Sequence, residues 1–329
     1  MNGTATGTHP ARQIRQIGVI TAGAVALFVL VRRLPTGTNL AHVDFQPRGA
    51  GALQFCDPGN PAFLPVMAVR SPVSMDLRAD GPVVSGRRIQ LALTLRTASG
   101  KPIGPRDLLV THAHLLHLMI VDPSLRDYQH VHPAPGAEPG EWTTEFEPRR
   151  AGAYRLFADF TPEATGRGLY ASADLDVPGR PGAQPPEDNW VCESDGLRFA
   201  LATDGPLRAR AVVTLALSIE NAEAGKPVPL EPTMGAWAHL VAIDAARSGF
   251  AHLHPQQADL TKRPDEFRPR FTFQIQLPDP GRYVVWSQVR IAGRDRFAPF
   301  WVKVEPCDPR ILGAGLLVPA GGCLWYKLN

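Results

Sequence analysis

Short stretches in which apolar and polar residues alternate recur along most of the chain and predict an all-β protein. The clearest are Ile89–Leu95 (IQLALTL) and Val213–Ile219 (VTLALSI), where apolar residues fill every second position, as on the buried face of a strand. A turn signal stands before each stretch, at Asp80-Gly81-Pro82 and at Asp204-Gly205-Pro206. About six or seven short strands in each half, with turns about every 8 to 12 residues, are typical of an antiparallel β-sandwich of immunoglobulin-like or cupredoxin-like type.

The two halves of the chain carry the same landmarks in the same order, which indicates a tandem duplication. The pattern H-x4-D-x5-[YF]-x-H-x-H-P begins at His117 and again at His239, 122 residues later. A second shared motif begins at Gly152 and at Gly281, 129 residues apart, so seven residues are inserted between the two landmarks. Several unrelated landmarks at matching spacing predict a duplicated domain of about 110 residues.

These landmarks and the composition divide the chain into two domains and their flanking segments. We expect a short strand near Leu53–Phe55 in the first linker, and an apolar C-terminal tail that packs on the second domain. The predicted segments are an N-terminal signal-anchor (1–34), a linker (35–68), the first β-sandwich repeat (69–178), a Pro-rich linker (179–194), the second repeat (195–306) and the tail (307–329).

An apolar stretch near the N-terminus indicates export. Ile17–Val31 is uncharged, Arg12 and Arg15 precede it, and Arg32-Arg33 closes it. Its length is nearer to that of a signal-peptide core than to the 20 or so residues of a membrane span. Because no clean small-x-small cleavage motif follows, an uncleaved single-pass membrane anchor is slightly favoured. We therefore expect an extracytoplasmic body, periplasmic or extracellular, held at the cell membrane.

Composition excludes several other classes of protein. The 33 prolines and 30 glycines are too many for a helical bundle or a coiled coil. The net charge of +3 comes from scattered basic residues, so no nucleic-acid surface is indicated. The four cysteines form no C-x-x-C motif, and two disulfides or free thiols remain open.

The histidines concentrate in two short stretches, where eight of the ten lie. In the first stretch, His117 and Met119 would share one face of a strand, and His130 and His132 would share a face of the next strand. If residues 122–127 form a hairpin loop, Met119 lies opposite His130 and His117 opposite His132, close enough for one metal ion. Imidazole suits copper and zinc, and a thioether favours Cu(I). His112 and His114 are candidates for additional ligands.

The second stretch repeats this arrangement with a change in its ligands. His239, His252 and His254 are kept, whereas Val241 replaces the methionine and Met234 stands at the position of His112. The second set therefore predicts a weaker metal site, a site of different metal preference, or a structural relic.

One other interpretation of the histidines remains open, and two more are disfavoured by the neighbouring residues. The histidines could be buried and tie the hairpins together in a scaffold that binds a protein partner. A zinc-dependent enzyme would need a positioned base, and Asp122 and Asp244 look like turn residues instead, as Tyr154 and Asp159 look like structural residues of a core strand. No cysteine stands beside the histidines as a blue-copper centre requires. The residues thus favour metal binding without catalysis, by copper or alternatively zinc.

The sequence also resembles a known family. The residues His117–Asp122, Tyr128–Pro133 and Gly152–Phe157, with their second copies, look like those of exported bacterial β-sandwich domains similar to YtkA-like and related copper-handling, heavy-metal-binding proteins. The likeness covers most of residues 70–305. It implies an exported sandwich fold and the handling of copper or another heavy metal, with these histidines as the positions to test.

Overall fold

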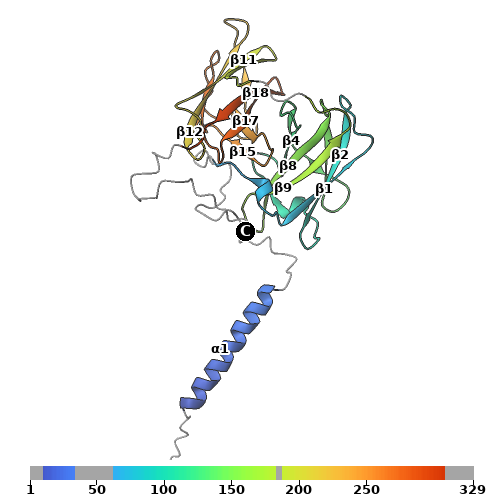
Figure 1. Ribbon diagram of the computed structural model, residues 1–329, viewed down its shortest axis with the longest axis vertical. Coiled ribbons are helices and arrows are strands. Elements are labelled where there is room, and N and C mark those ends of the chain that lie inside the picture. The colour runs from blue at the N-terminus through green and yellow to red at the C-terminus, as the bar shows by residue number, and fades with distance from the viewer. Residues whose placement is uncertain (1–9, 34–61, 183–186, 308–329) are drawn as a thin grey trace, which may run out of the picture.

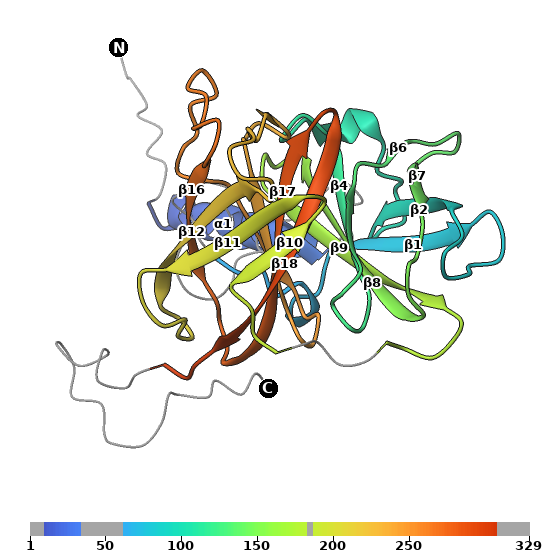
Figure 2. The same cartoon turned by 90° about the horizontal axis from the view of Figure 1, so that it is seen from above.

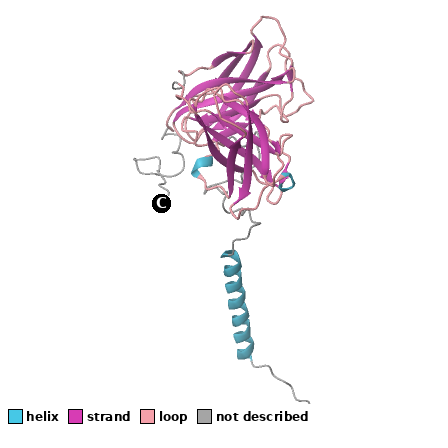
Figure 3. Cartoon of the chain, turned by 90° about the vertical axis from the view of Figure 1, so that its right-hand side faces the viewer, coloured by secondary structure: helices cyan, strands magenta, loops and turns pink. Residues whose placement is uncertain are grey.

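The computed structural model describes residues 10–33, 62–182 and 187–307. Apart from one N-terminal helix and two short 3-10 helices, η1 (Val66–Ala68) and η2 (Pro105–Asp107), the regular structure is β (Figure 3). The strands form four antiparallel sheets, two in each half of the chain. The prediction of an all-β protein with two tandem repeats is therefore confirmed.

The first repeat is built from a four-stranded and a five-stranded sheet. The four-stranded sheet has the order β1-β2-β7-β6, and the other has the order β3-β8-β4-β5 with β9 beside β8. Its strands are β1 (Val73–Ala79), β2 (Ile89–Thr97), β3 (Leu108–Leu109), β4 (Leu116–Val121), β5 (Tyr128–Val131), β6 (Ala134–Pro135), β7 (Glu141–Phe146), β8 (Gly152–Pro162) and β9 (Leu169–Val177).

The second repeat has the same plan, except that an edge strand, β10, is added beside β11 and that β16 has no neighbour equivalent to β6 among the described residues. Its sheets have the orders β10-β11-β12-β16 and β13-β17-β14-β15, and β18 pairs with β17. The added strand β10 occupies the end of the segment 179–194, which was predicted to be linker throughout. Its strands are β10 (Val191–Ser194), β11 (Leu197–Thr203), β12 (Val212–Asn221), β13 (Leu230–Glu231), β14 (His239–Asp244), β15 (Phe250–Leu253), β16 (Arg270–Gln276), β17 (Gly281–Ile291) and β18 (Arg294–Val304).

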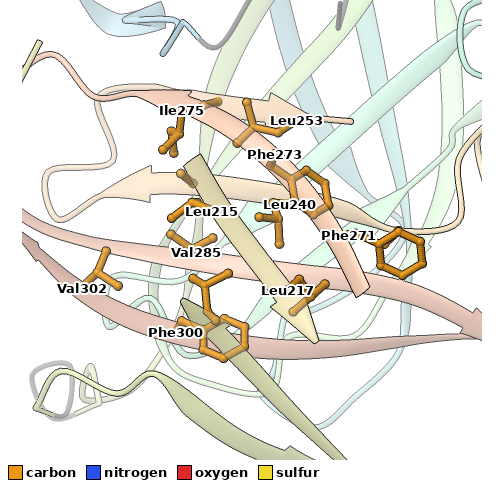
Figure 4. Close-up of a cluster of buried hydrophobic side chains, with 14 of the residues drawn as sticks. Leu215, Leu217, Leu240, Leu253, Phe271, Phe273, Ile275, Val285, Phe300 and Val302 are labelled. Carbon is orange, nitrogen blue, oxygen red and sulfur yellow. The ribbon is translucent and has the colours of Figure 1, made fainter. Parts of the chain in front are cut away.

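Each repeat encloses its own apolar core between its two sheets. In the first repeat Leu91 and Leu93 of β2 pack with Leu118 and Ile120 of β4. Figure 4 shows the second core, where Leu215 and Leu217 of β12 meet side chains from β14, β16, β17 and β18. In both repeats the alternation seen in the sequence directs these residues inward, because successive strand residues point to opposite faces.

A third apolar cluster joins the two repeats, which lie side by side (Figures 1 and 2). It is formed by the outer faces of the β4/β8 and β14/β17 sheets. Tyr128 stacks on Trp286 with ring centroids 5.5 Å apart, and Phe250 meets Phe157, also at 5.5 Å. Because Phe250 corresponds to Tyr128 and Phe157 to Trp286 in the repeat alignment, the two contacts are reciprocal. The repeats therefore meet across an approximate two-fold axis.

The segment that enters the first repeat is fastened to the second repeat. Leu64 and Phe250 exchange both backbone hydrogen bonds, at 2.7 and 3.1 Å, and Phe63 enters the second core. Gly249 permits this approach, since a Cβ there would collide with the carbonyl of Leu64. Residues 62–68, predicted to be linker, therefore act as a strap between the repeats. The expected strand near Leu53–Phe55 and the C-terminal tail from residue 308 onward lie outside the described residues.

Replacing Phe63 with alanine should destabilise the second repeat. The Phe63 ring is buried and meets the Tyr283 ring edge to face, with ring centroids 5.9 Å apart. Removing the ring would leave a cavity. Such truncations cost about 3–5 kcal/mol. Urea unfolding of the full-length protein in detergent would measure the loss. Val69→Ala, at an exposed position of the same segment, should change the free energy of unfolding by less than about 0.5 kcal/mol, and an equal effect of both changes would contradict the strap.

The N-terminal helix α1 (Pro10–Arg33) is longer than the apolar stretch that predicted it. An 18-residue window, Ile14–Val31, is apolar enough to cross a membrane, and none of its side chains is buried in the protein. At about 1.5 Å per residue this window spans about 27 Å, close to the thickness of a bilayer core. A membrane anchor and a signal peptide both meet these criteria.

Candidate metal centre

Eight histidines from both repeats meet at the interface between them. His117 lies on β4 and His130 on β5, and their counterparts His239 and His252 lie on β14 and β15. The ladder pairs Met119 with His130 and Val121 with Tyr128, so the predicted hairpin register is confirmed. The rings of His130 and His252 lie 5.3 Å apart across the interface. The two histidine stretches therefore form one continuous cluster.

The first triad consists of His117, His130 and His132, whose nearest ring nitrogens all lie within 4.8 Å of one another. The Nε2 atom of His117 lies 3.0 Å from the carbonyl of Thr111, which can only accept, so this nitrogen carries the proton. Nδ1 of His130 donates to Oε1 of Gln288 at 2.9 Å. The two remaining nitrogens, Nδ1 of His117 and Nε2 of His130, then face each other with lone pairs at 3.3 Å.

Two facing lone pairs repel each other unless a cation lies between them. Two nitrogens at about 2.0–2.1 Å from one tetrahedral ion are about 3.4 Å apart, which matches the separation of His117 and His130. A histidine that binds a metal through one ring nitrogen usually donates a hydrogen bond from the other, and His117 and His130 both have this arrangement. The first triad thus fits a metal ion.

The second triad consists of His239, His252 and His254, and its nitrogens also lie within 4.8 Å of one another. Both ring nitrogens of His239 and of His252, and Nε2 of His254, have no hydrogen-bond partner among the residues that the structure describes. Buried polar groups are nearly always paired, and each exception requires an explanation. A metal ion would supply the missing partner for three of these nitrogens at once.

Burial keeps the triad histidines neutral, the form that binds metal. Loss of water, with repulsion from the neighbouring rings, lowers the pKa of His117 to about 4 and the pKa of His130 and His254 to about 3. Burial is also the main reason why the pKa of His132 is lowered to about 2. For the same reason the pKa values of His239 and His252 lie well below 6.5. The cluster therefore presents uncharged imidazoles at neutral pH.

Two matched turns bring His112 and Met234 into the cluster. In the first, Thr111 and His114 exchange backbone hydrogen bonds at 2.9 and 3.0 Å around His112 and Ala113. His112 and Ala113 have φ of 50° and 69°, which are values of a type I′ turn. In the second repeat Thr233 and Ala236 enclose Met234 and Gly235 in the same way, with φ of 48° and 78°. Non-glycine residues rarely adopt these angles, and such strain gathers at functional sites.

Met119, predicted as a ligand of the first site, and His112 and His114, predicted as additional ligands, take different places. Met119 shares the face of His117, but its side chain is part of the apolar cluster between the repeats. His114 stacks on His132 with ring centroids 3.6 Å apart. His112 lies nearer to His254, at 4.2 Å, than to His117, at 6.0 Å. The sulfur that contacts a triad histidine is that of Met234, 3.1 Å from Nε2 of His132.

Sequence reasoning missed Gln288 and assigned Asp159 a purely structural role. Gln288 lies beside His239 in the ladder, and Asp159 lies beside His117. Gln288 reaches across the interface to His130, so it orients a histidine of the other repeat. Asp159 is the equivalent residue of the first repeat, and burial raises its pKa to about 7. The signal for both residues was a polar side chain in an otherwise apolar strand.

The matching aspartates of the two hairpins are turn residues, as predicted. Oδ1 of Asp122 accepts the backbone N–H groups of Arg126 and Asp127 at 2.7 and 2.9 Å. Asp244 accepts the N–H of Ser248 at 2.7 Å. These carboxylates close the loops that set the hairpin register.

Comparison with known proteins bears on the duplication. A family model described as a domain of unknown function (DUF8832) matches the chain twice, over residues 70–177 and 192–306. A search among curated proteins finds no match. The two matches confirm the tandem repeat, whereas the resemblance to YtkA-like copper-handling proteins remains a prediction.

Proposed function

The chain belongs, through both of its repeats, to the family described as a domain of unknown function (DUF8832), and from the geometry of its histidines we propose that it binds metal ions, copper in the first place, without catalysis. The ions would lie in the two triads at the interface between the repeats. Zinc is the alternative metal, because imidazole ligands suit both.

One observation carries this proposal: the second triad holds five buried ring nitrogens without a partner among the described residues. An unpaired polar group in the interior costs about 1–3 kcal/mol. Five such groups in one cluster would destabilise a purely structural site by several kcal/mol. Coordination of a metal would satisfy three of the five nitrogens, and the facing lone pairs of the first triad support the same reading.

The proposed location follows from α1. The helix is apolar enough to cross a membrane, and we place the β repeats on the extracytoplasmic side, in the periplasm or outside the cell, with α1 as an uncleaved anchor. The resemblance to exported copper-handling domains supports both the location and the metal. No nucleic acid is involved in this function, and a protein partner would be the donor or acceptor of the metal.

The test is a metal titration of the full-length protein in detergent with Cu(I), Cu(II) and Zn(II). We expect about two metal ions in total for the unaltered protein, one in each triad, and about one in total for each of the His130→Ala/His132→Ala and His252→Ala/His254→Ala variants. The matched control is His9→Ala/His43→Ala, which changes the two histidines that lie outside the two histidine stretches of the sequence and should keep both metal ions.

Circular dichroism would show that each variant keeps its β structure. Absence of saturable binding, or two equivalents retained in both triad variants, would overturn the proposal. The rival function, a protein-interaction scaffold in which the histidines only tie the hairpins, would then remain. The hydrogen bond from His130 to Gln288 of the other repeat is the observation that favours this rival.

A further inference from the structure

Each of the two matched turns carries a donor side chain from one repeat to the triad of the other repeat. Met234 belongs to the second repeat, yet its sulfur lies 3.1 Å from Nε2 of His132 in the first triad. His112 belongs to the first repeat, yet its ring centroid lies 4.2 Å from that of His254 in the second triad. Because Met234 and His112 occupy equivalent positions, the two contacts are related by the approximate two-fold axis.

We infer that the protein has two composite four-ligand metal sites, each made of one triad and one donor from the opposite repeat, and that the two sites differ in metal preference. This inference rests on the proposed metal-binding function. The first site is the first triad with the Met234 sulfur, and the second is the second triad with His112.

The donor sets determine the preference. Three imidazoles and a thioether form a site that is softer than four imidazoles, and thioether ligands select Cu(I). A four-imidazole site suits Cu(II) or Zn(II). Burial supports both assignments, since His112 and Met234 are largely shielded from water and Met234 is only 4 % exposed. The first site therefore takes Cu(I), and the second takes a divalent ion.

The turns explain why these two donors are held in place. Residues at the first central position of a type I′ turn have a left-handed backbone, which fixes the direction of the side chain. The backbone hydrogen bonds across each turn are complete, and the carbonyl of Thr111 also accepts from His117. The first turn thereby ties the donor of the second site to a ligand of the first site.

The decisive experiment compares two buried methionines near the interface between the repeats, Met234 beside His132 and Met119 in the apolar cluster. Met234→Leu and Met119→Leu each replace a buried thioether with an apolar side chain of similar size. Competition with a Cu(I) chelator, on the full-length protein in detergent, should show an affinity loss of at least about tenfold for Met234→Leu, the scale on which changes around a metal site act. Met119→Leu should bind Cu(I) as tightly as the unaltered protein. X-ray absorption should show a sulfur neighbour of copper in the unaltered protein and in Met119→Leu, but not in Met234→Leu.

A gain of binding tests the second site. His112→Met would give the second triad the same donor as the first, so the number of tightly bound Cu(I) ions should rise from one to two. His112→Asn, which keeps a residue that tolerates a positive φ, should weaken Zn(II) binding at the second site and leave Cu(I) binding at the first site unchanged.

The outcomes separate this inference from the function on which it rests. If the unaltered protein binds none of the three ions, the proposed function is wrong. If it binds them but Met234→Leu behaves like the unaltered protein, or Met119→Leu loses the sulfur neighbour, the function stands and the composite sites are overturned. Unchanged Cu(I) stoichiometry in His112→Met would overturn the second composite site.

Discussion

Below about pH 6 the metal-free protein is expected to lose much of its stability. The triad histidines have pKa values in the folded state below their ordinary 6.5, at about 4 for His117 and about 3 for His130 and His254. The unfolded chain therefore binds more protons than the folded chain between about pH 4 and 6.5. Stability is complete above pH 6.5 and falls as the pH decreases through this window.

The effect is large because many rings act together. Each histidine that is protonated only after unfolding lowers the free energy of unfolding by about 1.4 kcal/mol per pH unit. Several such rings together lower the free energy of unfolding by several kcal/mol within one pH unit, whereas the total stability of a protein is typically about 5–15 kcal/mol. Asp159 acts in the opposite direction, since its pKa of about 7 in the folded state lies above its ordinary 3.8, but it offsets only about one histidine.

Urea unfolding in the presence of a chelator, at pH 7.5, 6.5 and 5.5, would measure this dependence. His239→Leu/His252→Leu removes two titrating rings from the second triad and should flatten the slope. A free energy of unfolding that stays constant from pH 7.5 to 5.5 would show that the rings are not buried together as described.

An aspartate in place of Val241 is expected to separate the repeats and to abolish both metal sites, although it alters no ligand. Val241 is 1 % exposed, lies opposite His252 and Trp286 in the ladders, and belongs to the cluster between the repeats. A carboxylate there would lose its hydration inside the apolar cluster between the repeats, which costs several kcal/mol. Its neighbours Leu240 and Ala242 face the second core, so the repeat itself should stay folded.

Limited proteolysis and small-angle scattering would detect the separation, and metal titration would detect the loss of the sites. The matched control is Val241→Met, which introduces the residue found at the same position of the first repeat and should keep the repeats together. Metal binding that survives in Val241→Asp with separated repeats would show that each triad suffices without the opposite repeat.

The sequence allowed the strands and the hairpin register to be predicted because both follow from local periodicity. Alternation predicted strands at Ile89–Leu95, which lies within β2, and at Val213–Ile219, which lies within β12, and the shared landmarks predicted the duplication. The convergence of His117, His130 and His132 followed from the register alone, and the structure brings their ring nitrogens together.

What could not be predicted depends on contacts between the repeats. Both faces of β4 are buried. One face meets the core of the first repeat, and the other meets the second repeat. Met119 was chosen as the sulfur ligand because it is near in the same strand. Met234 lies 102 residues from His132, and periodicity carries no information over such a distance. The strap could not be predicted either, because Phe63 packs in the core of the second repeat, far away in the sequence.

The reciprocal contacts across the two-fold axis are those of an isologous homodimer. In such a dimer residue i of one copy contacts residue j of the other, and residue j of the first copy contacts residue i of the second. A single-repeat ancestor would have built this centre only by self-association, with two identical sets of ligands. Fusion of two gene copies freed His112 and Met234 to diverge independently. The same joining of chains makes assembly of the centre independent of protein concentration.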